Sequence, residues 1–254
     1  MAMMEIEYTK KYQRMSLNYH QTMIELIPLH GLPIITPGVD LPALISEHLE
    51  ELIREGDIVV VTHSIVSVAE NKLFKVNSSD GKKDNRTEIA IKEAREVIRE
   101  TPILITRTIH GLITDFSGVD ESNAPPGMLI GLPDDPDASA ENICNAISKR
   151  VGFGVPVIIT DTQGRPWRQG AINLAIGVAG MSPFVINKGR KDIYGKTLQS
   201  SLVCIADEIA ASAELVMGQA DEKIPIAIVR GISYTQSTGT AHEILREESK
   251  DLFR

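Results

Sequence analysis

The sequence predicts an α+β protein in which mixed sheets pack against helices. Apolar, β-branched runs typical of buried strands, IVVVTHSIVS (58–67) and VPVIIT (155–160), are separated by segments with helical periodicity. These segments follow one another without a regular strand–helix–strand rhythm, which favours α+β over a doubly wound parallel sheet. With 254 residues, 43% of them hydrophobic, the chain can bury a substantial core.

The N-terminal elements are predicted in order along the chain. Residues 1–22 are polar and form an extension, which is either an arm that packs on a partner subunit or a loose terminus. Residues 23–254 then form a single unit of one or two lobes. In that unit, GLPIITPG (31–38) predicts a rigid turn before a helix that begins near Asp40. The run 58–67 predicts a buried strand that ends near Ser67.

The middle of the chain alternates between loops, helices and a hairpin. Residues 77–86 are polar and predict a loop, and 87–100 have the periodicity of a helix. A hairpin is expected to turn near 110–111. A further helix should begin near Asp137 and end in a basic turn, which suits the helix dipole.

The C-terminal half begins with the apolar strand at 155–160. A glycine-rich stretch follows at 164–180, and then a basic loop, NKGRKDIYGK, at 187–196. Apolar residues keep helical spacing from Leu198 to the glycine at 218, which predicts one long helix. The last strand is IPIAIVRGIS at 224–233.

The overall composition indicates which classes of partner and which cellular compartment to expect. The 34 acidic and 26 basic residues give a formal charge of -8, which repels nucleic acid. No run approaches the roughly 20 apolar residues of a membrane span, and the first residues lack the apolar centre of a signal peptide. We therefore expect a cytoplasmic protein without nucleic-acid or membrane partners, in which Cys144 and Cys204 are reduced thiols rather than a disulfide.

The segment IITDTQGRPWRQG carries the clearest chemical signal. A buried strand brings Asp161 and Thr162 to its end, where a carboxylate and a hydroxyl could hold Mg²⁺ or Mn²⁺ through oxygen. Arg165 and Arg168 follow and could clamp the oxygens of a substrate anion. In the alternative interpretation, Asp161 caps a turn and both arginines are solvated.

Two further segments could complete such a site. SGVDESN places Asp120 beside Asn123, and Asp120 could share a metal–phosphate centre with Asp161 or simply form an Asx turn. In MGQADEKIP, Gln219 could offer a carbonyl oxygen to a metal, although a glycine cap at the end of the helix also explains this segment. The chain has no Walker A, GxGxxG, CxxC or HExxH motif, and His63 and His110 are not at ligand spacing.

Several segments resemble the coenzyme F-420 gamma-glutamyl ligase family, in consistent order from about residue 26 to 233. They are HGLP with PGVDL, GDIVVVTHSIVSVAE, GVDESN, LPDDPDASAENI, VIITDTQGRPWRQG, AIGVAGM, GRKDIYG, CIADEIAASAELVMG and IPIAIVRG. The resemblance implies the fold of that family and a homodimer with intertwined lobes. It also implies that L-glutamate is joined to the lactyl phosphodiester precursor of the deazaflavin coenzyme, through an acyl phosphate, with GTP and divalent cations.

The resemblance also implies residue roles, and it assigns no catalytic residue. The residues expected at the nucleotide are Gly31, Leu32, Pro33, Ile34, His63, Ser64, Asn123, Met217, Gly218, Gln219, Ala220, Asp221, Glu222, Lys223 and Ile224. The residues expected at Mg²⁺ or Mn²⁺ are Asp120, Asp161, Thr162 and Gln219.

The chain departs from the family's pattern in three places. Ser64 and Val68 stand where the pattern has lysines, and Gln219 stands where it has a glutamate. Phe116 and Ser117 replace an asparagine and an alanine near Asp120. These changes indicate a diverged member, which is either the F-420 ligase itself, a paralogue that acts on a related acid, or a non-catalytic homologue that binds a coenzyme or anionic metabolite as a sensor or partner subunit.

Overall fold

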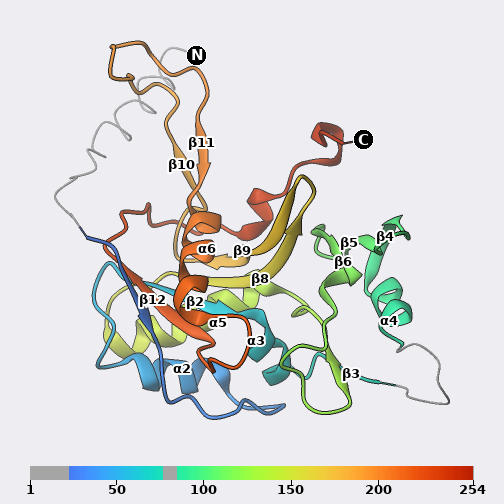
Figure 1. Ribbon diagram of the computed structural model, residues 1–254. Coiled ribbons are helices and arrows are strands. Elements are labelled where there is room, and N and C mark those ends of the chain that lie inside the picture. Colours follow the sequence, from blue (N-terminus) through green and yellow to red (C-terminus); the bar gives the residue numbers. More distant parts are fainter. Residues whose placement is uncertain (1–22, 77–84, 254) are drawn as a thin grey trace.

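A computed structural model describes residues 23–76 and 85–253 (Figure 1). The predicted extension at 1–22 and most of the predicted loop at 77–86 lie outside the described residues. The α-helices are α2 (Leu41–Leu49), α3 (His63–Ala69), α4 (Arg86–Lys92), α5 (Pro136–Val151) and α6 (Ile205–Met217). The strands are β1 (Glu25–Pro28), β2 (Ile58–Thr62), β3 (Leu73–Lys75), β4 (Ala94–Arg99), β5 (Ile105–Thr108), β6 (Ile113–Asp115), β7 (Met128–Ile130), β8 (Val157–Arg165), β9 (Arg168–Ala179), β10 (Phe184–Ile186), β11 (Leu202–Cys204) and β12 (Ile226–Arg230). Short 3-10 helices are η1 (Phe116–Gly118), η2 (Ala241–Ile244) and η3 (Glu248–Lys250).

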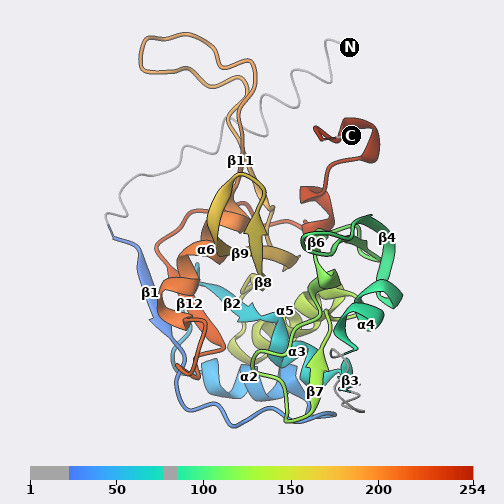
Figure 2. The same cartoon turned by 45° about the vertical axis from the view of Figure 1, so that its right-hand side comes forward.

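A five-stranded sheet forms the centre of the molecule, in the order β1-β12-β2-β8-β9. All neighbours in it are antiparallel except β2 and β8, which run parallel with Thr62 opposite Thr160. Helices α2 and α5 cover one face and α6 covers the other (Figures 1 and 2). This mixed sheet between helices confirms the predicted α+β class.

Strand β2 is apolar from Ile58 to Val61 because both faces of the sheet are covered there. Val59 and Val61 pack on the side of α2 and α5, whereas Ile58 and Val60 pack on the side of α6. These four side chains are completely buried. The alternation divides one short strand between two cores, which explains why its sequence lacks an apolar–polar pattern.

A smaller group of elements lies beside this sheet (Figure 2). Strands β4, β5 and β6 form one small sheet, and β3 pairs with β7. Their core gathers around Ile89, Leu104, Val119 and Leu129. The β5–β6 hairpin confirms the turn predicted near 110–111. Whether the chain divides into one or two lobes stays a prediction.

A hairpin arm projects away from the body between β10 and β11 (Figures 1 and 2). It contains the predicted basic loop. The Asp192 carboxylate accepts hydrogen bonds from the backbone N–H groups of Tyr194 and Lys196, both at 2.9 Å, and so fixes the turn at the tip. The side chains of Ile193 and Tyr194 are 91% and 89% exposed.

Two helices begin where the sequence predicts. Asp40 precedes α2, and its carboxylate accepts a hydrogen bond from the Ala43 amide at 3.1 Å. Helix α5 begins at Pro136, after Asp135 has capped the Ala138 amide at 3.0 Å. Its last turn is basic, as predicted. Cap residues act locally, so the sequence alone reveals these helix starts.

Four element predictions were wrong or incomplete. The run 58–67 is a strand only to Thr62, where α3 begins. The segment 87–100 contains the short α4 and then β4, which pairs with β5. The stretch 164–180 is mostly β9 rather than a glycine-rich loop, and the helix predicted from Leu198 begins only at Ile205, after β11. In three of these cases strand pairing decides between conformations that the local sequence allows, because β4 pairs with β5, β9 with β8 and β11 with β10.

Two bulk expectations can be compared with the structure. Cys144 and Cys204 are free thiols, as predicted. Burial raises the pKa of the Cys204 thiol to about 12, so it is protonated near neutral pH.

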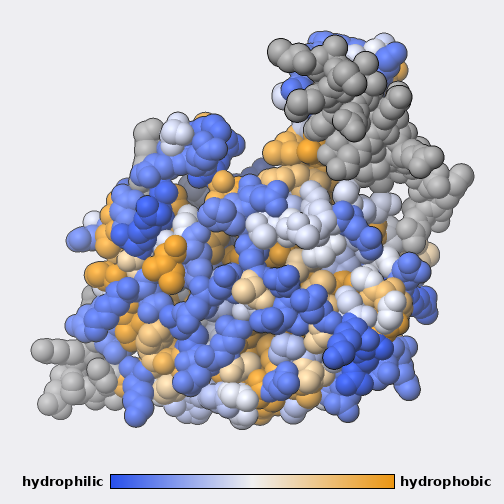
Figure 3. Space-filling model, turned by 180° about the vertical axis from the view of Figure 1, so that it is seen from behind, coloured by the Kyte–Doolittle hydropathy of each residue, from blue (hydrophilic) through white to orange (hydrophobic). Residues whose placement is uncertain are grey.

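Within 23–76 and 85–253, the helices are all too short or too polar to cross a bilayer. Figure 3 shows hydrophilic side chains interspersed with small apolar areas on the rear face.

Candidate functional site

Several strand ends meet at one edge of the central sheet. The end of β1 lies opposite the start of β12, because Pro28 pairs with Ala227. The start of β12 in turn pairs with the end of β2, and the Thr62 amide donates to the Pro225 carbonyl at 3.0 Å. The segments that adjoin these ends include 31–34, His63 and the loop 217–224. The topology therefore directs three segments predicted for the nucleotide to the same edge of the sheet.

Asp161 lies at this edge and is held by two neighbours. It is 7% exposed, and its Oδ1 lies 3.3 Å from Nε2 of His63, the first residue of α3. Gln163 donates to its Oδ2 at 3.4 Å. The parallel pairing of β2 with β8 explains the contact, because Thr62 lies opposite Thr160 and the next residues, His63 and Asp161, therefore lie side by side. Strand β8 continues past Asp161 to Arg165, so the prediction that the strand ends at Asp161 and Thr162 was wrong; pairing with β9 extends it. His63 and Asp161 are thus one unit, although the sequence separates them by almost a hundred positions.

Thr162 belongs to a second set of side chains, near the end of α6. Its Oγ1 lies 2.6 Å from Oδ1 of Asn173 on β9 and 3.0 Å from Oε1 of Gln219. Gln219 also donates from Nε2 to the Asn173 oxygen at 3.3 Å. A hydroxyl has one hydrogen and can donate to only one of these oxygens at a time. Thr162, Asn173 and Gln219 therefore present a group of closely spaced oxygen atoms.

Asn173 was missed by the sequence analysis. It is 4% exposed and lies opposite Thr162 in the β8–β9 pairing. Its backbone amide donates to Oε2 of Glu214 on α6 at 2.9 Å. The segment that contains it was described only as a glycine-rich stretch, so no strand register was assigned. A regular hairpin built from the Arg165–Arg168 pair would place Ala171 opposite Thr162, and only the register shift between Gln163 and Arg165 brings Asn173 there.

A bulge in β9 adjoins this group and is stabilised by α6. The pairing shifts between Ile159 and Thr160, and one residue of β9 is left over. The Ala175 amide donates to the carboxylate of Asp207 at 3.0 Å. Asp207 and Glu214, both on α6, thus supply acceptors for strand amides. Their role in holding β9 distinguishes them from the acidic residues predicted to bind a metal.

Asp120 makes a different set of contacts. It forms an isolated bridge with Ile130, and its Oδ1 lies 3.5 Å from Nη2 of Arg86. Burial raises the pKa of its carboxyl, but hydrogen bonds from Ser122 and the Glu121 amide, together with the Arg86 charge, outweigh burial and lower the pKa overall. Within the described residues, these contacts include none with Asp161. The proposed sharing of one cation by the two aspartates stays a prediction.

One departure from the family's pattern has a structural explanation here. The guanidinium of Arg86 lies 4.3 Å from the centre of the Phe116 ring, an arrangement that favours a cation–π interaction. Phe116 thus supports the arginine that faces Asp120. The neighbouring Ser117 hydroxyl donates to the Ala90 carbonyl at 2.6 Å. Both side chains therefore make contacts with other residues of the protein in the wall beside Asp120.

The lysine positions of the family's pattern differ in their surroundings. Val68 is 5% exposed and belongs to the apolar core, whereas the Ser64 hydroxyl lies 3.1 Å from that of Thr62. Lys72 is close by but engaged, because its Nζ lies 2.8 Å from both Glu93 and Asp134. Partial burial lowers the pKa of Lys72, yet these hydrogen bonds outweigh burial and raise it overall. The positive charge that Lys72 could offer a phosphate is therefore already paired.

The loop after α6 is closed by one of its own side chains. The Ala220 amide donates to Oε2 of Glu222 at 2.8 Å, and hydrogen bonds from this amide and from the Glu222 amide lower the pKa of that carboxyl. Gly218 has a φ of 73°, and a Cβ there would overlap the Glu222 side chain. The loop is thus a compact turn that needs glycine at 218. The predicted glycine cap is present, with the Gly218 amide bonded to the Glu214 carbonyl at 2.9 Å.

The remaining predicted residues are exposed or lie in turns. Gly31 has a φ of 84°, and Ile34 is 91% exposed. Asn123 has a φ of 58° in the loop after Asp120. Arg165 donates from Nη2 to the carbonyls of Gln169 and Gly170, at 3.1 and 3.3 Å, near the tip of the β8–β9 hairpin. No ligand contact tests these assignments, so they stay predictions.

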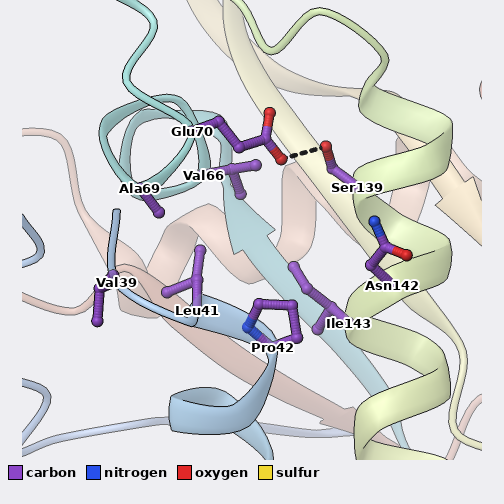
Figure 4. Close-up of a pocket in the computed structure, with 9 residues that line it drawn as sticks. All are labelled: Val39, Leu41, Pro42, Val66, Ala69, Glu70, Ser139, Asn142 and Ile143. Carbon is purple, nitrogen blue, oxygen red and sulfur yellow. Dashed lines mark hydrogen bonds between the residues drawn. The ribbon is translucent and has the colours of Figure 1, made fainter. Parts of the chain in front are cut away.

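Two hollows lie on the α5 side of the sheet. Figure 4 shows the smaller one, of about 70 Å³, between α2, α3 and α5, where the Ser139 hydroxyl donates to Glu70 at 2.6 Å. It has room for only a few water molecules. The larger one, of about 440 Å³, opens over the first turn of α5 and includes His110, Ile176 and His242 in its lining. Neither contains the Asp161 or Thr162 side chains.

The donor set around Thr162 fits a hard cation better than a soft one. Mg²⁺ and Mn²⁺ prefer carboxylate, hydroxyl and carbonyl oxygens, and here Thr162 supplies a hydroxyl oxygen while Asn173 and Gln219 supply amide carbonyl oxygens. The Asp161 carboxylate contacts His63 and Gln163 instead. Across 23–76 and 85–253, no three His, Cys, Asp or Glu side chains gather in a group that could hold a metal. Any metal bound here would therefore depend on neutral oxygens, on water or on the substrate's phosphates.

Comparison with known proteins identifies the family. A family model described as F420-0:Gamma-glutamyl ligase matches residues 31–231. The chain is 39% identical over 249 residues to the coenzyme F420:L-glutamate ligase of Methanothermobacter thermautotrophicus, covering 91% of this chain and 99% of the relative. It is 39% identical over 248 residues to that of Methanopyrus kandleri and 37% identical over 243 residues to that of Archaeoglobus fulgidus, covering 91% of this chain in both cases and 97% and 96% of the relatives. These matches show that the chain is an enzyme, a ligase, and that it belongs to the F420-0:gamma-glutamyl ligase family.

Proposed function

We propose that this chain is a GTP- and divalent-metal-dependent ligase that adds L-glutamate to a coenzyme F420 precursor. The observation that carries the proposal is the convergence of 31–34, His63, Asp161 and the 217–224 loop at one edge of the sheet, in a chain whose relatives are named coenzyme F420:L-glutamate ligases. A paralogue acting on a related acid remains the alternative. The sensor alternative loses support because the relatives are enzymes.

The proposed reaction has two steps, phosphoryl transfer and then amide formation. A carboxylate oxygen of the precursor attacks the γ-phosphorus of GTP, GDP leaves, and an acyl phosphate forms. The glutamate amine then attacks the acyl carbon, phosphate leaves, an amide forms and the amine loses a proton. Phosphoryl transfer depends mainly on positioning and charge neutralisation, so the enzyme needs few covalent participants.

The residues have distinct parts in this proposal. Asp161, Thr162 and Gln219 would hold Mg²⁺ or Mn²⁺, with Asp120 as a further ligand from the neighbouring loop. A bound cation would neutralise part of the negative charge of the phosphates. His63 orients the Asp161 carboxylate through their 3.3 Å contact. The loop 217–224 and segment 31–34 would line the nucleotide, and Arg165 and Arg168 would hold an anionic part of the acceptor.

The direct test is a binding and turnover experiment on the whole chain. Isothermal titration with GTP and Mn²⁺ should show saturable heat, and GDP should then form only when both L-glutamate and the coenzyme precursor are present. Titration without heat at millimolar nucleotide contradicts the GTP assignment. GDP formation with another acid but not with the precursor would support the paralogue.

The predicted homodimer is also part of the proposal. The β10–β11 arm exposes Ile193 and Tyr194 on a turn fixed by Asp192, which gives a preformed element for docking. Its loop carries Lys188, Arg190, Lys191 and Lys196, whereas the chain as a whole has a formal charge of -8. A second, acidic copy of this chain is therefore a suitable partner. Light scattering should give a dimer mass, and Ile193→Asp with Tyr194→Asp should lower it.

The cytoplasm remains the proposed compartment. Its support is the two free thiols, Cys144 and Cys204, since reducing compartments keep thiols unpaired. Fractionation of the cells that produce this protein tests the proposal.

A further inference from the structure

An exposed aromatic pair lies at the tip of the β8–β9 hairpin. Trp167 is the chain's single tryptophan and is 78% exposed. Its ring centre lies 5.8 Å from that of Phe253, which is 69% exposed, and the planes are inclined by 49°. Both rings bring a large apolar surface that is normally buried or bound. We name this pair the aromatic platform.

The aromatic platform joins two distant parts of the chain. The hairpin tip lies near the C-terminal segment in Figure 1, and the contact between the two rings joins them. The Phe253 amide donates to the Asp251 carboxylate at 2.9 Å, which orders the backbone beside the ring. The contact between the rings is thus supported by local structure on the C-terminal side.

Two arginines flank Trp167 in the hairpin turn. Arg165 and Arg168 lie opposite each other in the last pair of the hairpin, on either side of Trp167. Arg165 is tied to the carbonyls of Gln169 and Gly170, so its guanidinium stays near the tip. Planar aromatic surface next to guanidinium groups suits a ligand that combines a planar ring with an anionic group.

The distance to the candidate catalytic edge fits a long ligand. A strand rises about 3.3 Å per residue, so the four positions from Asp161 to Arg165 cover about 13 Å along β8. Trp167 lies beyond that point. A molecule with its ring on the aromatic platform would therefore need an extended chain to place its reacting carboxylate near Asp161. The proposed acceptor has this form, with a deazaflavin ring at one end and a lactyl group behind a phosphodiester at the other.

We propose that the aromatic platform stacks the planar heteroaromatic ring of the acceptor, with Arg165 and Arg168 facing its phosphodiester. This inference rests on the proposed function and adds a binding site for the acceptor's ring. GTP also combines a planar ring, its guanine base, with an anionic group, its phosphates. The experiment below therefore compares the two ring systems.

The single tryptophan makes the test direct, because indole emission from this chain reports on position 167 alone. The full-length protein is titrated with the deazaflavin coenzyme and, separately, with GTP and Mn²⁺, with correction for absorbed light. Saturable quenching by the coenzyme and none by GTP is expected. Absence of quenching by the coenzyme, or quenching by GTP alone, overturns the proposal. A change in emission with protein concentration alone also overturns it, because it would place Trp167 in a subunit contact.

Variants give an independent measurement. Trp167→Ala should raise KM for the acceptor about tenfold or more, as loss of a stacked ring does elsewhere, with kcat little changed. Trp167→Phe should restore most of the affinity because it keeps a planar ring. Leu252→Ala is the matched control, since Leu252 is 68% exposed and precedes Phe253. Thermal melting should show that the variants are folded, because Trp167 is largely exposed.

The outcomes separate this inference from the proposed function. If the wild type ligates glutamate and Trp167→Ala keeps the wild-type KM for the acceptor, the platform proposal fails and the function stands. If the wild type does not form GDP with glutamate and precursor, the proposed function is wrong. The fluorescence titration with the coenzyme then decides by itself whether the platform binds the ring.

Discussion

Asp161 is the residue on which the proposed chemistry depends most directly. It is buried within β8, it contacts His63, and it precedes Thr162. Asp161→Asn keeps the shape but removes the negative charge. We expect ligase activity to fall by at least about 100-fold, since charge neutralisation at a phosphate is worth several kcal/mol. Asp115→Asn, at the end of β6, is the control and should stay near wild type in a GDP-release assay. Equal activity of the two variants would remove Asp161 from the mechanism.

Asp57 and Arg230 illustrate a residue pair that stabilises the fold rather than the site. The Arg230 Nε and Nη2 atoms each lie 2.8 Å from an Asp57 carboxylate oxygen, and Asp57 is 1% exposed. These hydrogen bonds raise the pKa of Arg230. Asp57→Ala leaves the guanidinium without its main partner and should lower the free energy of unfolding by about 3–5 kcal/mol.

The control for this prediction is an exposed pair of the same type. Arg150 lies 2.9 Å from Glu50, but the two side chains are 37% and 51% exposed. Glu50→Ala should therefore cost at most about 1 kcal/mol. Urea unfolding measures both variants. Similar losses for Asp57→Ala and Glu50→Ala would show that burial does not set the strength of these pairs.

At the scale of elements, α5 approaches β9 through a glycine. A Cβ at Gly177 would overlap the Pro136 carbonyl in the first turn of α5. Gly177→Ala must push the helix from the sheet, and we expect a loss of about 1–3 kcal/mol in unfolding free energy. Gly164→Ala is the matched control, because nothing lies within 4 Å of its added Cβ. Chemical denaturation distinguishes them, and equal stability of both variants would contradict the close approach.

The contact between α3 and α5 should make stability depend on pH. Burial raises the pKa of Glu70, the Ser139 hydrogen bond lowers it, and the charges of Asp134 and Asp135 raise it, with a net increase above 4.5. The folded state thus binds this proton more tightly than the unfolded chain does. Ionisation of Glu70 therefore weakens folding as the pH rises above 4.5. The effect should stay below about 1 kcal/mol because Glu70 is exposed to solvent.

Two variants test the sign of this pH dependence. Glu70→Gln should flatten the fall in stability with rising pH, because the titrating group is gone. Ser139→Ala removes the hydrogen bond that lowers the pKa of Glu70 and should make the fall steeper. The measurement is urea unfolding at a series of pH values above 4.5. A steeper fall in Glu70→Gln than in the wild type would contradict the assignment.

The secondary-structure elements also show which features the local sequence predicts and which it does not. Cap residues Asp40 and Asp135 mark the starts of α2 and α5 correctly, because the hydrogen bonds they accept are made within three positions. Residues 94–99 have helical periodicity but form β4, because pairing with β5 is available. No local pattern reports that pairing. The same reason hides the position of Asn173 opposite Thr162.

At the scale of the whole molecule, ligand binding should stabilise the folded state. GTP with Mn²⁺ at a hundred times its dissociation constant should add about 2.7 kcal/mol to the free energy of unfolding. The thermal midpoint should rise accordingly. GTP with a chelator should give a much smaller rise. Without the cation, the neutral oxygens of Thr162, Asn173 and Gln219 cannot neutralise the negative charge of the phosphates. Calorimetry measures both, and an equal rise with chelator would argue against a metal-dependent site.

The sequence by itself determined the α+β class, the starts of α2 and α5, the free cysteines and the family, because caps, apolar runs and motifs are local properties of a chain. It also marked Asp161, Thr162 and Gln219 as residues of interest. Only the tertiary structure decided that Asp161 contacts His63 and that Thr162 contacts Asn173 and Gln219. These contacts depend on strand order and register, which are set by burial of two cores on opposite faces of one sheet.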